Sequence, residues 1–221
     1  MTENELSIPK TCRYCSFGNT TNPQTIWFTL HGYGQLAKYF IKNFESLNPE
    51  ENLVIAPEGF HRFYLDGMKG RVGASWMTSE DRLTDISDYV NYLDLLHDTV
   101  VQKLKKDNHR LIVLGFSQGV ATASRWMALG NTKPDAAVFW AGSFPPDLKP
   151  AESKRWFSDI PTWCVIGDSD KYISDENIES AKKHFDSLGI SPKWLRYKGG
   201  HKIPEDAFEE LSGMVSGVHL D

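Results

Sequence analysis

A short motif bounded by two glycines, residues 115–119, constrains the fold of this chain more than any other feature. The motif reads Gly-Phe-Ser-Gln-Gly, it follows the apolar run 111–114, and a stretch with helical character comes directly after it. In a strand–turn–helix of this kind the serine has a strained backbone angle, and a side chain at either glycine would collide with the adjoining strand or helix. The strain lifts the hydroxyl of Ser117 clear of the backbone. The sequence therefore predicts a nucleophilic serine at a sharp turn between a buried strand and a helix.

The rest of the chain alternates between apolar runs of strand length and segments of helical period. The predicted strands cover residues 11–17, 25–30, 52–56, 111–114, 136–140, 162–166 and 193–197. The predicted helices cover residues 36–47, 86–104, the stretch after Ser117, 175–188 and the stretch from about residue 204. This alternation is typical of an α/β protein with a mostly parallel central sheet and helices on both faces.

One long stretch, residues 57–82, shows no clear period and is rich in glycine and aromatic residues. Long irregular segments in compact domains are commonly functional loops, so we expect a loop here. The connection 142–160 is too short for a large lid. The sequence has no repeat and no second-domain boundary, and residues 1–221 are predicted to form a single domain.

Composition and charge narrow the class of protein. A net charge of -5 argues against a nucleic-acid partner, and no basic cluster suggests binding to a membrane surface. No segment approaches the apolar length of a transmembrane helix, so no integral membrane association is expected. Residues 1–6 are acidic and polar, unlike a secretory signal. We therefore expect a cytoplasmic protein.

The three cysteines do not indicate a redox or metal site. Cys12 and Cys15 form a C-x-x-C pattern, but in an extended segment where residues three apart point to opposite faces. A zinc site would need a second pair of Cys or His residues, and none is evident. All three thiols, including Cys164, are predicted to be reduced.

Two later segments supply the groups that a serine nucleophile needs. A serine hydroxyl reacts only with the help of a base, and the base needs a group that orients it. In a sheet of this kind these groups follow the serine in the order acid and then histidine, each in a loop at the carboxyl end of a strand. Asp168 and Asp170 both follow the predicted strand 162–166 and are candidate acids. His201 follows the last strand and two glycines that free its loop, so it is the predicted base.

Two backbone N–H groups are predicted to stabilise the oxyanion of the reaction. One belongs to Gln118, which follows the nucleophile at a helix N-terminus, where the helix dipole also favours negative charge. The other is assigned to Tyr33 in the segment 30–34, Leu-His-Gly-Tyr-Gly, which follows an early strand. The glycines on either side of Tyr33 let the backbone turn inward.

Each of these assignments has a simpler alternative. Ser117 could lie in an ordinary glycine turn, and His201 could be a solvated loop histidine. The orienting acid could be Asp170 or Asp168, and if it is Asp170 then Asp168 is a turn or capping residue. His31 precedes the motif and closes a strand, so we expect it to make a structural hydrogen bond. The other histidines show no ligand spacing, and no metal is predicted: His61, His97, His109, His184 and His219.

Most of the aromatic side chains are interpreted as core. Trp76 and Phe144 are the exceptions, because Trp76 ends the irregular stretch and Phe144 follows a strand end. Both are predicted to contact substrate. For Phe60, Phe63 and Tyr64, a pocket and a core position are equally supported.

Taken together, the motifs resemble the phospholipase/carboxylesterase family of α/β-hydrolases, a group that includes the acyl-protein thioesterases. The resemblance extends over nearly the whole chain and rests on residues 30–34, 74–76, 115–119, 167–170 and 199–201. It implies an α/β-hydrolase fold without a large lid, and it requires no cofactor.

The same resemblance implies a role for individual residues. Ser117, Asp170 and His201 would form the catalytic triad, with Asp168 as a turn residue, and Tyr33 and Gln118 would donate to the oxyanion. The pair at 75 and 76 falls where the family lines its acyl-binding groove. The chain departs from the family pattern at Gln35 and at residues 171–174, which puts the choice of substrate in doubt.

We therefore expect a cofactor-free serine carboxylesterase that hydrolyses small to medium acyl esters through an acyl-enzyme. Its partner would be a small-molecule ester. An acyl thioesterase or a lysophospholipase is the alternative within enzymes, and a non-catalytic α/β-hydrolase that binds a ligand is the alternative outside them. The sequence leaves open whether the chain acts as a monomer or as a homodimer.

Overall fold

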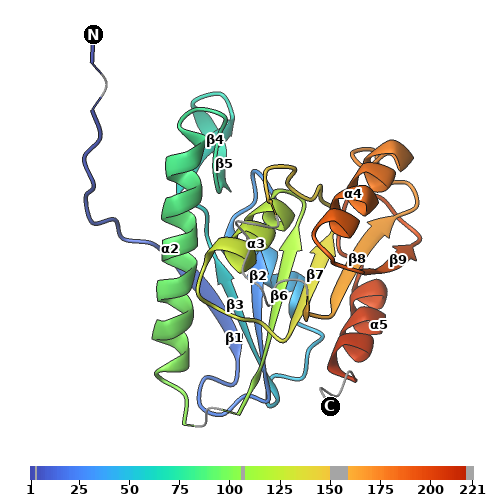
Figure 1. Ribbon diagram of the computed structural model, residues 1–221. Coiled ribbons are helices and arrows are strands. Elements are labelled where there is room, and N and C mark those ends of the chain that lie inside the picture. The colour runs from blue at the N-terminus through green and yellow to red at the C-terminus, as the bar shows by residue number, and fades with distance from the viewer. Residues whose placement is uncertain (3, 106–107, 150–158, 218–221) are drawn as a thin grey trace.

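A computed structural model of the protein describes residues 1–2, 4–105, 108–149 and 159–217 (Figure 1). The strands of its central sheet are β1 (Tyr14–Gly18), β2 (Thr25–Leu30), β3 (Asn52–Pro57), β6 (Arg110–Phe116), β7 (Ala136–Trp140), β8 (Thr162–Gly167) and β9 (Lys193–Tyr197). They are arranged in the order β1-β3-β2-β6-β7-β8-β9. Only β1 runs antiparallel to its neighbour, and the other pairs are parallel. The predicted mostly parallel sheet is confirmed.

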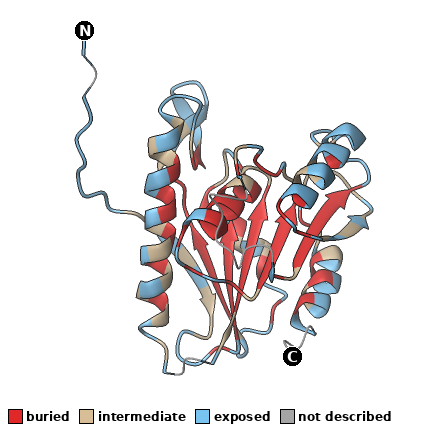
Figure 2. Ribbon diagram, viewed as in Figure 1, coloured by how far each residue is buried: buried red, intermediate tan, exposed pale blue. Residues whose placement is uncertain are grey.

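Helices cover both faces of the sheet. On one face lie α2 (Arg82–Val101), α3 (Gln118–Leu129) and α4 (Asp175–Ser187). On the other lie α1 (Ala37–Phe40), the 3-10 helix η1 (Ile41–Phe44) and α5 (Glu205–Ser216). Successive strand residues point to opposite faces, so Phe28 packs in the first layer and Trp27 in the second. The buried sides of the helices face the sheet (Figure 2).

The inner strands are buried along almost their whole length, which explains why they appear as continuous apolar runs. The predicted bounds of β2, β7 and β9 agree with the structure, and β8 extends one residue further. The first strand begins at Tyr14 rather than at Thr11. Because the sheet is parallel, the carboxyl ends of β6, β8 and β9 meet at the same edge.

The prediction of a long loop over residues 57–82 is wrong. Two strands, β4 (His61–Asp66) and β5 (Lys69–Ser75), form an antiparallel hairpin there. Figure 1 shows the hairpin beyond the sheet, beside the N-terminal end of α2. Most of its residues are at least partly exposed, so no buried face marks it in the sequence. The dipeptide Asp66-Gly67 was the available signal, since Asp-Gly is typical of hairpin turns and Gly67 has a φ of 68°.

Two further expectations concern the outside of the fold. Among the helices that the structure describes, none has both the length and the apolar character needed to cross a lipid bilayer. The connection 142–160, predicted to be too short for a large lid, includes residues 150–158, which lie outside the described residues.

Candidate active site

Ser117 lies at the turn where β6 ends and α3 begins. Its φ of 54° and ψ of -118° are strained for a residue with a side chain. The turn is possible because the two flanking glycines approach other backbone closely. A Cβ at Gly115 would overlap the carbonyl oxygen of Gly119, and a Cβ at Gly119 would overlap that of Leu30. The strained turn predicted from the motif is therefore present.

A chain of hydrogen bonds joins the three residues assigned to the triad. The hydroxyl of Ser117 lies 2.9 Å from Nε2 of His201. On the other side of the ring, Nδ1 of His201 lies 2.8 Å from Oδ2 of Asp170. A carboxylate can only accept, so Nδ1 carries the hydrogen and Nε2 is left to accept from the serine hydroxyl. This tautomer is the one that a general base requires.

The two candidate acids after β8 have different partners. The carboxylate of Asp170 has a side-chain exposure of 0% and also accepts the backbone N–H of Tyr172 at 2.9 Å. The carboxylate of Asp168 is exposed and accepts the backbone N–H of Gly199 at 2.9 Å. Asp168 therefore holds two loops together, and Asp170 holds the histidine.

The loop that carries His201 is held in place by side chains of two strands, β9 and β7. The hydroxyl of Tyr197 lies 2.6 Å from the carbonyl oxygen of Gly200 and 2.7 Å from that of Lys202. The indole N–H of Trp140 donates to the same Lys202 oxygen at 3.0 Å. These contacts on both sides of His201 hold the imidazole over the edge of the sheet.

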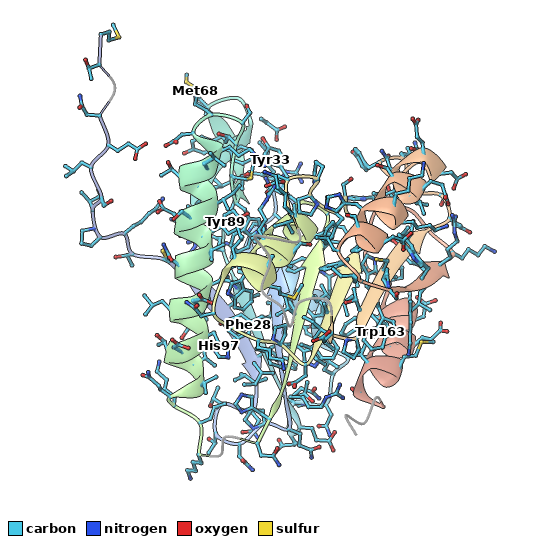
Figure 3. The ribbon with its side chains drawn as sticks, viewed as in Figure 1. Phe28, Tyr33, Met68, Tyr89, His97 and Trp163 are labelled. Atoms are coloured by element: carbon cyan, nitrogen blue, oxygen red, sulfur yellow. The ribbon has the colours of Figure 1, made fainter. Side chains whose placement is uncertain are left out.

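Tyr33 and Gln118, whose backbone N–H groups are the predicted oxyanion donors, line a cavity of about 440 Å³ together with Ser117 and His201. Within the described part of the chain, neither amide donates to a protein acceptor. Amides in this state are free to donate to an oxyanion. The ring of Tyr33, labelled in Figure 3, packs at 5.0 Å on Phe63 of the hairpin. The hairpin therefore supports this side of the site.

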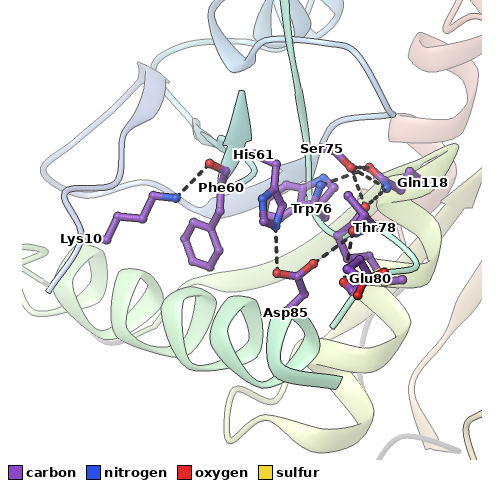
Figure 4. Close-up of polar contacts among 10 residues, drawn as sticks. Lys10, Phe60, His61, Ser75, Trp76, Thr78, Glu80, Asp85 and Gln118 are labelled. Atoms are coloured by element: carbon purple, nitrogen blue, oxygen red, sulfur yellow. Dashed lines mark hydrogen bonds and ion pairs between the residues drawn. The ribbon is translucent and has the colours of Figure 1, made fainter. Parts of the chain in front are cut away.

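The side chain of Gln118 has a role that the sequence did not reveal. Its amide nitrogen donates to the Ser75 hydroxyl at 2.9 Å and to the Met77 carbonyl at 3.1 Å. Its amide oxygen accepts the backbone N–H of Trp76 at 3.2 Å (Figure 4). The residue after the nucleophile is thus clamped to the segment that follows β5, which fixes the direction of its own N–H.

Trp76 and His31 are buried and pack on each other beside the hydrogen bonds of the Gln118 side chain. Trp76 has an exposure of 0%, donates its indole N–H to the His31 carbonyl at 2.9 Å and stacks on the His31 ring. A side chain without exposed surface has none to offer a substrate, so the structure places Trp76 in the core rather than in the expected groove. His31 makes the structural hydrogen bonds predicted for it, to the Gly32 carbonyl at 2.8 Å and from the Gly59 N–H at 2.9 Å. Burial lowers the pKa of His31, which favours its neutral form.

The other aromatic residues divide between core and surface. Phe144 is buried against Phe185 at a ring distance of 4.3 Å, where it lines a second cavity. Phe60 packs on Tyr92, whereas half of Tyr64 is exposed. None of Phe60, Phe63 and Tyr64 lines the cavity at Ser117.

One aromatic residue at the site carried no signal in the sequence. Tyr172 lies in the loop after Asp170, and its ring packs edge-on against the imidazole of His201 at 4.7 Å. Its side chain is 74% exposed, and it lines the cavity at Ser117 together with Tyr33. Among the described residues, no three His, Cys, Asp or Glu side chains gather in a way that could hold a metal ion.

Solved structures share this fold over nearly its whole length. The structure of esterase PE8 superposes with a TM-score of 0.72 at 22% identity and covers 95% of this chain and 100% of its own. Acyl-protein thioesterase 2 of Zea mays gives 0.71 at 18% identity, with 92% and 97% covered. The Bacillus cereus carboxylesterase gives 0.68 at 14% identity, with 93% of each chain covered. The resemblance drawn from the motifs is confirmed, as is the α/β-hydrolase fold.

A family profile gives the closer assignment. The profile described as serine hydrolase (FSH1) matches residues 22–210, which include the strained serine turn, the acid loop and the histidine. The chain therefore belongs to the serine hydrolase (FSH1) family and is a serine hydrolase.

Proposed function

We propose that the protein is a serine carboxylesterase that hydrolyses small to medium acyl esters, with Ser117, His201 and Asp170 as its catalytic triad. The observation that carries this proposal is the continuous hydrogen-bond chain from the Ser117 hydroxyl through His201 to the buried carboxylate of Asp170. The chain begins at a serine whose strained turn presents it to a cavity of about 440 Å³. These features together are what acyl transfer by a serine requires.

In the first half of the reaction, Oγ of Ser117 bonds to the ester carbonyl carbon, and its proton moves to Nε2 of His201. The electron pair of the carbonyl bond moves to oxygen, where the N–H groups of Tyr33 and Gln118 stabilise it by roughly 3 kcal/mol per donor. Asp170 stabilises the imidazolium that forms. The oxyanion then collapses, the bond to the alcohol oxygen breaks, and the imidazolium protonates the leaving alcohol.

In the second half, water replaces the alcohol. His201 takes a proton from the water as it attacks the acyl-enzyme, and the same two amides hold the second oxyanion. The proton then returns to Oγ of Ser117 as the carboxylic acid leaves. Every group in this sequence belongs to the protein, the substrate or water, and no cofactor takes part.

Thioesters and lysophospholipids would follow the same steps, because the acyl carbon meets the same groups. Similarity to a Zea mays acyl-protein thioesterase makes the thioester the first alternative to compare. Rates on an oxygen ester and a thioester of one acyl length would separate the two activities. We also propose a cytoplasmic location, in keeping with three free cysteines, since reducing compartments preserve thiols.

The test is labelling by a fluorophosphonate, which bonds covalently to an activated serine. The wild-type protein should label, and Ser117→Ala should not, while circular dichroism shows that both are folded. p-Nitrophenyl acetate turnover should be lost in the same variant. If the folded wild type neither labels nor turns over any ester, the protein is a ligand-binding member of the fold and the proposed activity is wrong.

A further inference from the structure

A second cavity of about 370 Å³ lies between α4 and the sheet. Its volume is within the ~300–1,000 Å³ of small-molecule sites. Large apolar side chains from α3, β7, β8, α4 and the loop after β7 form most of its wall. They include Val120, Phe139, Phe144, Ile166, Ile178 and Phe185. Such a wall suits an apolar ligand.

The second cavity adjoins the one that contains the nucleophile. Gly142, Ser143 and Ile173 line both. At Gly142 the backbone passes so near the serine turn that a Cβ would overlap the carbonyl oxygen of Ser117 and the side chain of Val120. The α4 cavity therefore begins directly beside the nucleophile.

The two sides of Ser117 differ in the side chains that line them. Tyr33 and Tyr172 flank the cavity at Ser117 and are 62% and 74% exposed, so that side is open to solvent. The α4 cavity is lined by buried side chains such as Phe139 and Phe185, and also by exposed residues of α4 such as Asn177. During the reaction the alcohol must leave and water must enter, whereas the acyl group stays bonded to Oγ. A cavity with large buried apolar side chains in its wall therefore suits the acyl chain, and the side flanked by exposed Tyr33 and Tyr172 suits the leaving group.

The chemistry of the wall selects the kind of acyl group. Among the described residues that line the cavity there is no Asp or Glu, and its lysine, Lys183, is exposed. Cys164 also lines the cavity; it is buried, and among the described residues its thiol makes no hydrogen bond. Burying a polar acyl substituent against the apolar side chains of β7, β8 and α4 would cost free energy, because polar lining residues such as Asn177 and Ser180 are exposed.

The groove that the family resemblance suggested, at Ser75 and Trp76, is not available for this purpose. Their exposures are 1% and 0%, and their polar atoms bond to Gln118, Met77 and His31. An acyl chain could enter there only by breaking the clamp that holds the N–H of Gln118. The α4 cavity requires no such rearrangement.

We propose that the cavity under α4 is the acyl-chain pocket of the enzyme and that the preferred substrates are esters of unbranched, apolar acids of medium chain length. This inference rests on the proposed esterase function, because it takes the acyl carbon to be bonded to Ser117.

The test is a series of p-nitrophenyl esters from acetate to laurate. Each methylene that enters the cavity should raise kcat/KM about fourfold, equivalent to the ~0.8 kcal/mol of a buried CH₂. The rise should stop once the cavity is full. A profile that is flat with chain length in an enzyme active on acetate would overturn the inference and leave the esterase function intact.

Filling the cavity gives a sharper test. Ala181 is a half-buried residue of α4 on the cavity wall, so Ala181→Phe should shorten the pocket. We expect the ratio of octanoate to acetate kcat/KM to fall at least tenfold. The matched control is Ala207→Phe, because Ala207 is equally half-buried on a helix but packs against the opposite face of the sheet. That control should keep the wild-type ratio.

A second variant covers the case in which Ala181→Phe does not fold. Ile178→Ala enlarges the same cavity and should move the optimum to a longer acyl chain. An unchanged optimum in folded Ile178→Ala, or an unchanged ratio in folded Ala181→Phe, would overturn the pocket. A wild type that neither labels with fluorophosphonate nor hydrolyses acetate would overturn the esterase function and the pocket with it.

Discussion

Asp168 and Asp170 lie two residues apart in one loop, and their roles differ because their partners differ. The sequence placed both at the carboxyl end of a strand, where either could orient a histidine. The choice depends on which carboxylate faces the imidazole, and that follows from the loop conformation. In the structure Asp170 is buried against Nδ1 of His201, and Asp168 binds the backbone of Gly199. The predictions for Ser117 and His201 rest on clearer signals, since glycines mark both.

Asp170→Asn should lower kcat by roughly 10⁴-fold, as comparable substitutions do in other triads. The amide of asparagine can donate to Nδ1, which would move the ring hydrogen to Nε2 and remove the acceptor for the serine proton. Stability should change little, because the side chain keeps its size. Steady-state kinetics and thermal unfolding check both parts.

The control for this prediction is Asp168→Asn. The asparagine oxygen can still accept the N–H of Gly199, so activity should stay within several-fold of wild type. If this variant is the crippled one and Asp170→Asn is nearly normal, the assignment of the acid is wrong.

At the scale of elements, the sequence predicted the strands of the central sheet best. β2, β7 and β9 were located to the residue, as runs of apolar or alternating residues. The hairpin β4–β5 was missed because its exposed residues give no periodic signal. The predicted helix over residues 36–47 is instead the short α1 followed by η1, since the apolar spacing reports burial and not the hydrogen-bond pattern.

Glu58, directly after β3, joins the segment before β1 to β4 and α1. Its carboxylate accepts from Arg13 at 2.6 Å, from Arg62 of β4 at 2.8 Å and from the backbone N–H of Ala37 in α1 at 3.2 Å. Burial alone would raise the pKa of Glu58, but hydrogen bonds from Arg13, Arg62 and the Ala37 N–H, together with the charge of Arg13, outweigh it and lower the pKa. The folded protein therefore binds this proton more weakly than the unfolded chain does.

Glu58→Gln should lower the free energy of unfolding by about 2 kcal/mol at pH 7, the scale of a hydrogen bond to a charged group. The stabilisation by Glu58 is present above the glutamate pKa of the unfolded chain, ~4.3, and is lost as the pH falls through the lower folded value. The difference in the free energy of unfolding between wild type and Glu58→Gln should thus become smaller at acid pH. Urea unfolding at several pH values measures it.

Glu45→Gln provides the comparison, because Glu45 is exposed and has no ion pair among the described residues. It should leave stability unchanged within about 0.5 kcal/mol. If the difference in unfolding free energy between wild type and Glu58→Gln stays constant down to acid pH, the stabilising role given to the Glu58 carboxylate is wrong.

At the scale of the whole molecule, the site depends on contacts between distant parts of the chain. Ser117 and His201 are 84 residues apart and meet because β6 and β9 end at the same edge of one parallel sheet. The order of strands and helices in the sequence predicts such an edge. It does not predict the α4 cavity, whose size depends on how far the helix stands from β7 and β8. Likewise, nothing near Gln118 in sequence indicates that its side chain bonds to the end of β5.

Cys164, in β8, lines the α4 cavity, so the rate at which reagents modify its thiol depends on access to that cavity. Burial raises its pKa, so at neutral pH it is a protonated thiol that reacts slowly with alkylating reagents. Cys12 and Cys15 are partly exposed and should react first with a charged disulfide reagent.

In a Cys12→Ser, Cys15→Ser background, a small apolar maleimide should modify Cys164 more slowly when octanoate is present or when Ala181→Phe is added. Mass spectrometry would follow the modification, and equal rates in all three cases would mean that the reagent reaches sulfur by another path. If the rates differ as expected, the rate at which Cys164 is modified reports whether the cavity beneath α4 is occupied.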